Sequence, residues 1–337
     1  MSGSGPAKQS LGGALGRRRA AVSATPASLV RASGVSLPVT LEPSLRGVDL
    51  VAWAASRGDE IEARLCEHGG LLFRGFAVGG VEVFERFMRV TSGALLEYTY
   101  GSTPRTSVGG GVYTSTEYPA HLPIPLHNEM SYSRSWPARI GFYCRRAAEL
   151  GGETPVADSR RVLALISPAV KQAFARAGVM YVRNYGEGLD LGWEQVFGTG
   201  RREEVEEFCR RAGIEFEWKG GGRLRTRQVC QATARHPRTG EEVWFNQAHL
   251  FHVSALEASL RERLLSQFEE EDLPRNAFYG DGSPIEEAAL EEVRAAYAAA
   301  SVKFNWAEGD ILLLDNVLAA HGREPYAGAR SILAGMA

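Results

Sequence analysis

The chain has 337 residues, of which 44 % are hydrophobic and 23 % are charged, as in an ordinary globular protein. Its 38 basic and 40 acidic residues nearly cancel, which leaves no electrostatic case for nucleic-acid binding. No apolar run is long enough to predict a membrane-spanning helix. Small-molecule and acyl substrates both remain possible.

The N-terminal stretch, residues 1–35, is rich in Ala, Gly and Ser and contains Arg but no acidic residue. We expect a flexible basic arm there. A targeting leader is the alternative, but the stretch after the paired arginines is too polar for an export signal. The predicted folded part is a single domain over residues 36–337.

The first half of that domain begins with helical spacing of apolar residues over 48–69, stopped by Gly69 and Gly70. A buried strand over 70–76 and a helix over 81–90 are predicted next. Proline and glycine then interrupt the chain between about 95 and 135, which favours loops and short strands. We expect residues 97–120 to form a lid.

The second half alternates strands and helices. Strands are predicted over 139–144, 154–159, 302–323 and 329–336, and helices over 160–177, 203–212, 256–272 and 285–300. Ser167-Pro168 is a possible second helix start inside the first of these helices. Strands at both ends with helices inserted between them predict a mainly β core decorated by helices.

The four cysteines, Cys66, Cys144, Cys209 and Cys230, lie far apart and form no C-x-x-C pair. This excludes an obvious zinc knuckle or thioredoxin-like motif. We expect mostly buried free thiols in a reducing, cytoplasmic compartment.

Three residues could hold a metal. His127 and Glu129 form an H-x-E at the end of a proline-rich loop, and residues two apart on an extended strand project to the same face. His321 follows the apolar run LLLDNVLAA. Two imidazoles and one carboxylate make the facial triad of non-haem Fe(II) oxygenases, which leaves coordination positions open. Taken alone, the H-x-E pair could be an exposed loop pair and His321 a hydrogen-bonded surface residue. For the set of three, the alternative is a Zn²⁺ site that activates water.

A 2-oxo acid bound to iron has a far carboxylate that needs a cation, and Arg330 is the candidate because its planar fork matches a carboxylate. Thr154 is the candidate hydroxyl beside it. Neither residue would have a role in a zinc hydrolase.

The order H-x-E, Thr, His, Arg resembles the taurine dioxygenase and clavaminate synthase superfamily, with the syringomycin-biosynthesis-type hydroxylases closest. The resemblance covers residues 40–337 and rests on IPLHNEMSY, GGETPVADS, RTRQV, VWFNQAHLFH, YGDGSPIE and GDILLLDNVLAAHGREPYAGAR. It implies a mainly β fold with a double-stranded β-helix (jelly-roll) core and flanking helices. It also implies Fe(II), 2-oxoglutarate as co-substrate, and oxidation of an unactivated C–H bond. Hydroxylation of the β-carbon of an amino-acid unit in specialised metabolism is the favoured outcome, with desaturation or cyclisation as alternatives.

Two departures from the usual pattern matter. Only 8 residues separate His321 from Arg330, fewer than is usual, so Arg323 could hold the co-substrate instead. The acid is Glu129 rather than the commoner Asp. Halogenating relatives carry a small residue there, so halogenation is disfavoured.

Substrate contacts are predicted at Asn246 and Gln247, in the family-like string FNQAHLFH, and at Arg275 for a substrate carboxylate. We expect His249 and His252 to serve packing or the substrate pocket rather than a metal. The amino acid could be free or tethered to a peptidyl carrier protein, which could dock on a basic cluster, Arg223, Arg225 and Arg227. A non-catalytic binding protein of the same fold is the remaining alternative.

Overall fold

The structure is a computed structural model that describes residues 30–33, 37–97, 100–101, 105–186 and 191–337. Most of the predicted arm, and parts of the predicted lid, lie outside these residues. Within the stretch assigned to the arm, Val30–Ser33 forms strand β1, paired antiparallel with β2 (Val39–Pro43). Regular structure therefore begins before residue 36.

The largest sheet has eight strands in the order β1-β2-β3-β17-β7-β20-β5-β4, and only the β2–β3 pair is parallel. Its centre is fully buried because β17 carries the run ILLLD. The other members are β3 (Gly70–Phe73), β4 (Ser107–Gly109), β5 (Val112–Thr114), β7 (Arg139–Arg146), β17 (Ile311–Asp315) and β20 (Ser331–Met336). The sheet joins the early strands of the chain to its C-terminal end, as predicted.

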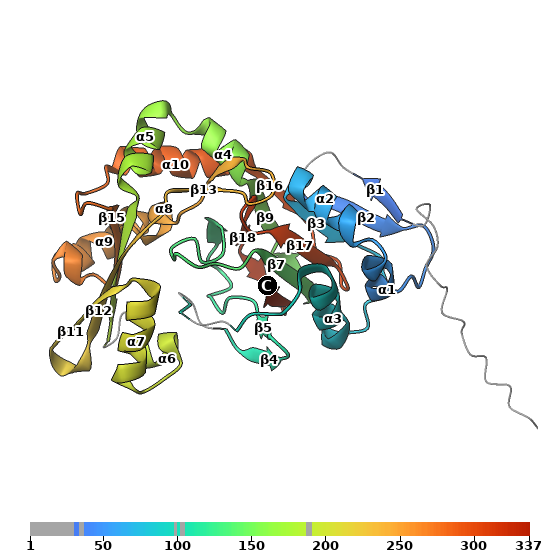
Figure 1. Ribbon diagram of the computed structural model, residues 1–337, viewed down its shortest axis with the longest axis horizontal. Coiled ribbons are helices and arrows are strands. Elements are labelled where there is room, and N and C mark those ends of the chain that lie inside the picture. Colours follow the sequence, from blue (N-terminus) through green and yellow to red (C-terminus); the bar gives the residue numbers. More distant parts are fainter. Residues whose placement is uncertain (1–29, 34–36, 98–99, 102–104, 187–190) are drawn as a thin grey trace, which may run out of the picture.

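Three helices pack beside this sheet, namely α1 (Leu50–Ala55), α2 (Gly58–His68) and α3 (Val81–Ser92) (Figure 1). The continuous helix predicted over 48–69 is wrong, because it breaks between α1 and α2. The Ser56 hydroxyl donates to the Trp53 carbonyl (2.8 Å), and such a local bond competes with helix continuation. Gly69 ends α2 with φ 78°, a left-handed conformation that suits glycine.

A second, four-stranded sheet carries His127, Thr154 and His321 of the residues singled out above. Its order is β16-β9-β18-β6, all antiparallel, with bounds Ser301–Phe304, Thr154–Asp158, Ala319–Arg323 and Ile124–His127. In the β18–β6 pair His321 lies opposite His127. The register shifts at Gly322, where a Cβ would lie 2.5 Å from the Ile124 carbonyl oxygen, so this close approach requires glycine.

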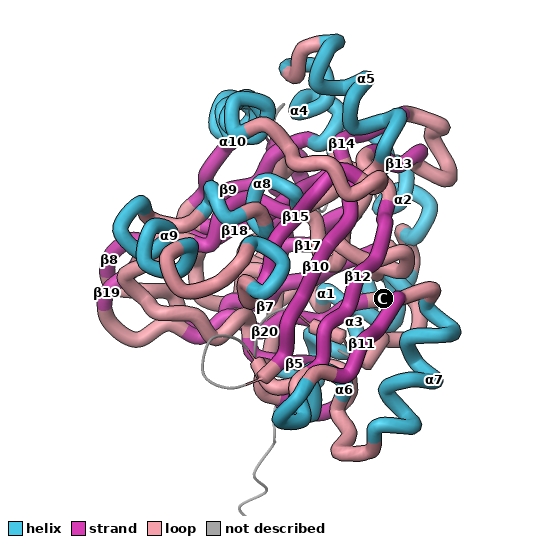
Figure 2. The backbone as a smooth tube through the Cα atoms, turned by 90° about the vertical axis from the view of Figure 1, so that its left-hand side faces the viewer, coloured by secondary structure: helices cyan, strands magenta, loops and turns pink. Residues whose placement is uncertain are grey.

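A third sheet, of order β11-β12-β10-β15, lies on the side of the molecule that faces the viewer in Figure 2. Its strands are Glu215–Trp218, Leu224–Cys230, Val179–Tyr185 and Arg275–Tyr279. Two short pairs, β13–β14 (Thr233–Arg235 and Glu242–Trp244) and β8–β19 (Leu150–Gly151 and Tyr326–Ala327), complete the strands. The flanking helices are α4 (Ser159–Leu165), α5 (Pro168–Ala177), α6 (Trp193–Phe197), α7 (Arg202–Ala212), α8 (Ala248–Phe251), α9 (Ala258–Leu265) and α10 (Glu287–Ala300). The predicted sheet-rich fold with flanking helices is confirmed.

Two helix predictions can be judged in detail. The possible second start at Ser167 is confirmed: its hydroxyl caps α5 by accepting from Val170 N–H, and Pro168 occupies the first turn. The helix predicted over 256–272 is wrong beyond α9. Residues Glu270–Asp272 form a short 3₁₀ turn instead, and Glu271 of this turn pairs with Arg225 of β12 (3.1 Å).

The four cysteines are free, and three of them are buried while Cys66 is half-buried. Burial raises the pKa of Cys144 and of Cys230 to about 12, and that of Cys209 to about 11. These thiols are therefore poor nucleophiles at neutral pH. Across the part of the chain that the structure describes, every helix is too short or too polar to cross a membrane.

Candidate metal centre

The predicted triad comes together at one end of the second sheet. His127 ends β6, Glu129 lies in the turn that follows, and His321 lies in β18. Each offers a ligand atom, and the three atoms lie within 4.8 Å of one another. The imidazole centroids of the two histidines are 4.6 Å apart because the residues are cross-strand partners. The strand register thus assembles the cluster.

The two imidazoles are in the protonation state that metal ligands need. His127 Nδ1 lies 2.8 Å from the Pro125 carbonyl oxygen, which can only accept, so Nδ1 carries the proton and Nε2 presents its lone pair. Burial lowers the pKa of His127, and burial with the nearby His127 and Arg105 takes the pKa of His321 well below its usual value. Both rings are therefore neutral at physiological pH, as metal binding requires.

The donor set fits a divalent transition metal. His321 Nδ1 is buried without a hydrogen-bond partner among the described residues, and its Nε2 lies 3.9 Å from Glu129 Oε2. A buried carboxylate close to two neutral imidazoles forms the N,N,O set of a facial triad. The arrangement therefore supports a metal with open positions rather than a closed structural site.

Arg105 is a site residue that the sequence analysis missed. Its Nη2 donates to Glu129 Oε2 at 2.6 Å, and both side chains are almost fully buried (3 % and 5 % exposed). It stands in an irregular stretch with no periodicity or motif around it. Nothing in the sequence distinguished it from a surface cation.

A cavity of about 30 Å³ opens beside His321 and is also lined by Thr154 and Arg330. Thr154 Oγ1 accepts a hydrogen bond from Trp306 Nε1 (2.9 Å), and an indole nitrogen only donates. The hydroxyl hydrogen of Thr154 has no acceptor among the described residues, so it can be donated to a ligand. Trp306 is a second residue that the sequence analysis did not single out.

Arg330 has a free fork. Its Nε donates to the Gly152 carbonyl (3.3 Å), while its two terminal nitrogens make no hydrogen bond to a described residue. Burial, with the nearby charge of Arg323, lowers the pKa of Arg330 to about 10. A carboxylate ligand would relieve this cost, because it favours the charged form.

Arg323, the alternative residue for binding the co-substrate carboxylate, already uses its terminal nitrogens in hydrogen bonds within the protein. Its Nη1 donates to Tyr118 O (3.0 Å), and its Nη2 donates to Pro119 O (2.7 Å) and Leu122 O (2.8 Å). These bonds tie β18 to the loop at 118–122. Of the two arginines, Arg330 is the one that can receive a carboxylate without losing such bonds.

A second cavity, of about 100 Å³, also borders His127 and is lined by Glu129, Gln247, Phe251 and Arg275. The Arg275 guanidinium stands 5.4 Å from the Phe251 ring centroid. The two cavities share four lining residues: Arg105, Thr116, Ile124 and His127. The cluster therefore faces two compartments, and residues 105 and 116 of the predicted lid line both.

The remaining substrate candidates differ in placement. Gln247 Nε2 donates to Asn128 O (2.8 Å), and its side chain lines the second cavity. Asn246 is fully buried and lines neither cavity: its Nδ2 donates to Ala232 O (2.7 Å), and its Oδ1 accepts from Ala248 N (3.1 Å). Only Gln247 of this pair is placed to meet a ligand.

His249 and His252 lie apart from the metal cluster of the described residues. His249 Nε2 lies 3.0 Å from the Leu126 carbonyl, and its ring stacks on Tyr297 at 4.6 Å. Burial lowers the pKa of His249 to about 3 and that of His252 to about 4. Both behave as neutral packing residues.

The predicted basic cluster is not an open cationic surface. Arg225 is buried and pairs with Glu271 and Asp272, while Arg227 pairs with Glu271 at 2.9 Å. Arg223 Nε donates to Gly220 O (3.2 Å). Two of these three charges are thus neutralised within the chain, which weakens the case for docking there.

The sequence profile of the family described as "Taurine catabolism dioxygenase TauD, TfdA family" matches residues 34–337. The chain belongs to this family. It is a non-haem iron dioxygenase, and its cofactor and co-substrate are Fe(II) and 2-oxoglutarate, which agrees with the His-Glu-His cluster described above. The predicted family, enzyme class and cofactors are confirmed.

Two relatives and one solved structure illustrate the similarity. The chain is 42 % identical over 272 residues to the dapdiamide synthesis protein DdaC of Enterobacter agglomerans, covering 81 % of this chain and 83 % of that protein. It is 30 % identical over 287 residues to a clavaminate synthase-like protein of Arabidopsis thaliana, covering 82 % and 83 %. The crystal structure of PvcB from Pseudomonas aeruginosa shares the fold, with a TM-score of 0.55 at 17 % identity over 93 % of this chain and 92 % of that one.

Proposed function

We propose that His127, Glu129 and His321 bind Fe(II), and that Arg330 and Thr154 bind the far carboxylate of 2-oxoglutarate. The observation that carries this proposal is that the two terminal nitrogens of half-buried Arg330 make no hydrogen bond to a described residue, in a cavity that His321 also lines. When bound, iron with 2-oxoglutarate and O₂ supplies the oxidising power to remove hydrogen from an unactivated C–H bond, with succinate and CO₂ as co-products.

The protein's own contribution is positioning and shielding. The Pro125 carbonyl holds the His127 ring in one tautomer, and Trp306 orients the Thr154 hydroxyl. Arg330 fixes the co-substrate at the end away from the metal. The second cavity, which His127 and Glu129 line, holds the substrate carbon that is oxidised.

We propose an amino-acid-derived substrate in specialised-metabolite biosynthesis, with β-hydroxylation as the reaction. The relative named for dapdiamide synthesis supports a biosynthetic role. Arg275 would pair with a substrate carboxylate and the Gln247 carbonyl oxygen would accept from an amine, since both residues line the cavity beside Glu129.

Carrier presentation is the finer part of this proposal. A carrier-tethered amino acid loses its α-carboxylate to a thioester, so Arg275 would then read a side-chain carboxylate. A free amino acid would place its α-carboxylate there. Incubating the enzyme with matched free and carrier-loaded amino acids separates the two: oxidation of the free form alone would defeat carrier presentation.

We also propose that the eight-stranded sheet and the β16-β9-β18-β6 sheet form a double-stranded β-helix within one domain, which comprises the predicted residues 36–337 and the outer strand β1 before them. The antiparallel pairing of both sheets, apart from the parallel β2–β3 pair, supports this proposal. The free cysteines support a reducing, cytoplasmic location.

Ligand-by-ligand substitution tests the metal assignment. His127→Ala, Glu129→Ala and His321→Ala should each abolish tight Mn(II) binding in calorimetry and 2-oxoglutarate-dependent succinate release, with an unchanged circular dichroism spectrum. His252→Ala is the matched control, because this histidine lies outside the cluster. Near wild-type metal affinity in any of the three ligand variants would remove that residue from the set.

A further inference from the structure

Asn316 makes an unusual pair of contacts with the metal-ligand segment. It is fully buried and lies in the turn between β17 and β18. Its Oδ1 accepts from Glu129 N (2.7 Å), and its Nδ2 donates to Glu129 O (2.9 Å) and to Pro137 O (2.8 Å). One side chain thus bonds both the N–H and the C=O of a single ligand residue, as a neighbouring strand would do in an antiparallel ladder.

The backbone of Asn316 is tied to the same region. Its N–H donates to Ala138 O (3.0 Å), and its carbonyl accepts from Asn128 Nδ2 (2.7 Å). Every polar group of Asn316 therefore has a partner, and all five bonds reach residues 128, 129, 137 or 138, in or near the ligand turn. A fully satisfied, buried network of this kind is rigid, and its loss leaves several buried groups unpaired.

The turn that carries Glu129 needs such support. Glu129 lies beyond the end of β6, outside any strand ladder. The next residue, Met130, has φ 56°, a left-handed backbone conformation that residues other than glycine rarely adopt. A strained conformation of this kind persists only where its surroundings hold it.

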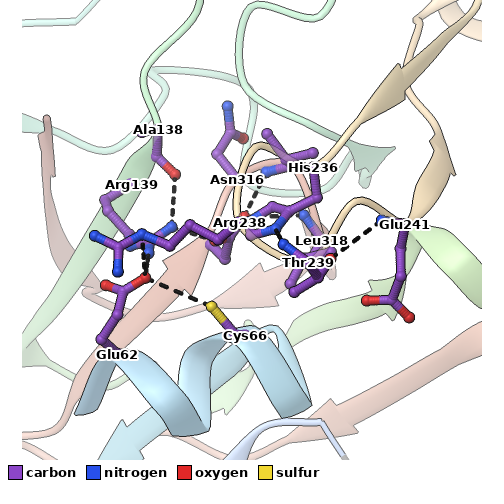
Figure 3. A network of polar contacts seen from close by, with 12 residues as sticks. Glu62, Cys66, Ala138, Arg139, His236, Arg238, Thr239, Glu241, Asn316 and Leu318 are labelled. Atoms are coloured by element: carbon purple, nitrogen blue, oxygen red, sulfur yellow. Dashed lines mark hydrogen bonds and ion pairs between the residues drawn. The ribbon is translucent and has the colours of Figure 1, made fainter. Parts of the chain in front are cut away.

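Asn316 is itself anchored from behind. The neighbouring Asp315, fully buried, accepts from Val317 N (3.0 Å) and Leu318 N (3.1 Å) and bonds His236 Nε2 (3.0 Å). It also pairs with Arg139, whose other nitrogen reaches Glu62 of α2 at 2.7 Å. Figure 3 labels Glu62, Arg139 and His236 of this network, together with Asn316 and its partner Ala138.

We infer that Asn316 is a positioning residue for the metal centre: it holds the Glu129 peptide so that the Glu129 carboxylate meets the two histidines. The inference rests on the proposed role of Glu129 as an iron ligand. Asn316 touches neither metal nor substrate, and it acts only through Glu129. Groups that orient a metal ligand typically change metal affinity by about 10–100-fold when removed.

The test compares Mn(II) affinity with folding stability. Asn316→Ala removes both contacts, and Asn316→Asp keeps the side-chain volume and the acceptor while removing the donor. Asn276→Ala is the matched control, since Asn276 is also fully buried and its Oδ1 accepts from Val253 N (3.0 Å) and Ala277 N (2.9 Å), away from the ligand turn. Calorimetric Mn(II) titration is run well below each variant's melting temperature, which is measured without metal.

Both Asn316 variants should bind Mn(II) about 10–100-fold more weakly than wild type. Asn276→Ala should lose stability without a change in metal affinity. Adding Met130→Gly to Asn316→Ala should recover part of the affinity, because glycine adopts positive φ without strain. Wild-type affinity in a folded Asn316 variant would overturn the inference, whereas failure of the wild-type protein to bind Mn(II) would overturn the proposed metal centre itself.

Discussion

Replacing Arg330 by alanine should weaken 2-oxoglutarate binding far more than metal binding. The two terminal nitrogens of Arg330 are the free part of its fork, and hydrogen bonds to charged groups contribute about 1.5–3 kcal/mol each. Taking about 3 kcal/mol for the bidentate pair, at 1.4 kcal/mol for each factor of ten, gives a dissociation constant about 100-fold higher. Arg330→Lys keeps the charge without the planar fork, so it should lose about 10-fold.

The assay is anaerobic calorimetric titration of 2-oxoglutarate into the Mn(II)-loaded protein, with Mn(II) affinity measured separately. Arg323→Ala is the control, because this residue donates three hydrogen bonds to the carbonyls of 118, 119 and 122. It should lower the melting temperature while changing the 2-oxoglutarate constant by only a few-fold. A larger effect at Arg323 than at Arg330 would refute the assignment and exchange the two roles.

Three further predictions follow from single contacts. Thr154→Val, but not Thr154→Ser, should raise the dissociation constant of 2-oxoglutarate about 10-fold in the same titration, since it removes a hydroxyl donor worth about 1.5 kcal/mol; equal constants would contradict the role of the hydroxyl. Gly322→Ala should destabilise the fold by about 1–3 kcal/mol in urea denaturation, because its Cβ would lie 2.5 Å from Ile124 O; unchanged stability would show that the strands can separate freely. Burial lowers the pKa of His249 to about 3, against 6.5 in the unfolded chain. Between pH 7 and pH 5 the unfolded chain therefore takes up a proton at this residue that the folded protein does not. The free energy of unfolding of the metal-free protein should fall by about 2 kcal/mol over this range because of His249. His249→Phe should flatten that part of the urea-measured pH dependence, and an unchanged profile would exclude His249 as its source.

The metal cluster could be anticipated because it depends on features that a sequence displays. An H-x-E at a strand end and a histidine after an apolar strand each have a recognisable pattern, and the family order of motifs linked them. Antiparallel pairing then brings His127 opposite His321. The cofactors followed from the same residues.

The supporting residues could not be anticipated for physical reasons. Arg105 and Trp306 act through contacts with residues distant in the sequence, and no local periodicity reveals such contacts. Asn246 and Gln247 are adjacent and chemically alike, yet only backbone geometry decides that Gln247 faces the cavity. The break between α1 and α2 was missed because apolar spacing continues through Ser56, whose hydroxyl bond ends the first helix.

The pairing of His127 with His321 also bears on how the protein folds. The two residues stand far apart in the chain, so their pairing closes a long loop, and contacts of this kind form slowly. Before that loop closes, each histidine alone would bind a metal ion only weakly. Metal added to the unfolded chain should therefore leave the folding rate unchanged and slow unfolding instead, because it stabilises only a structure that is already closed.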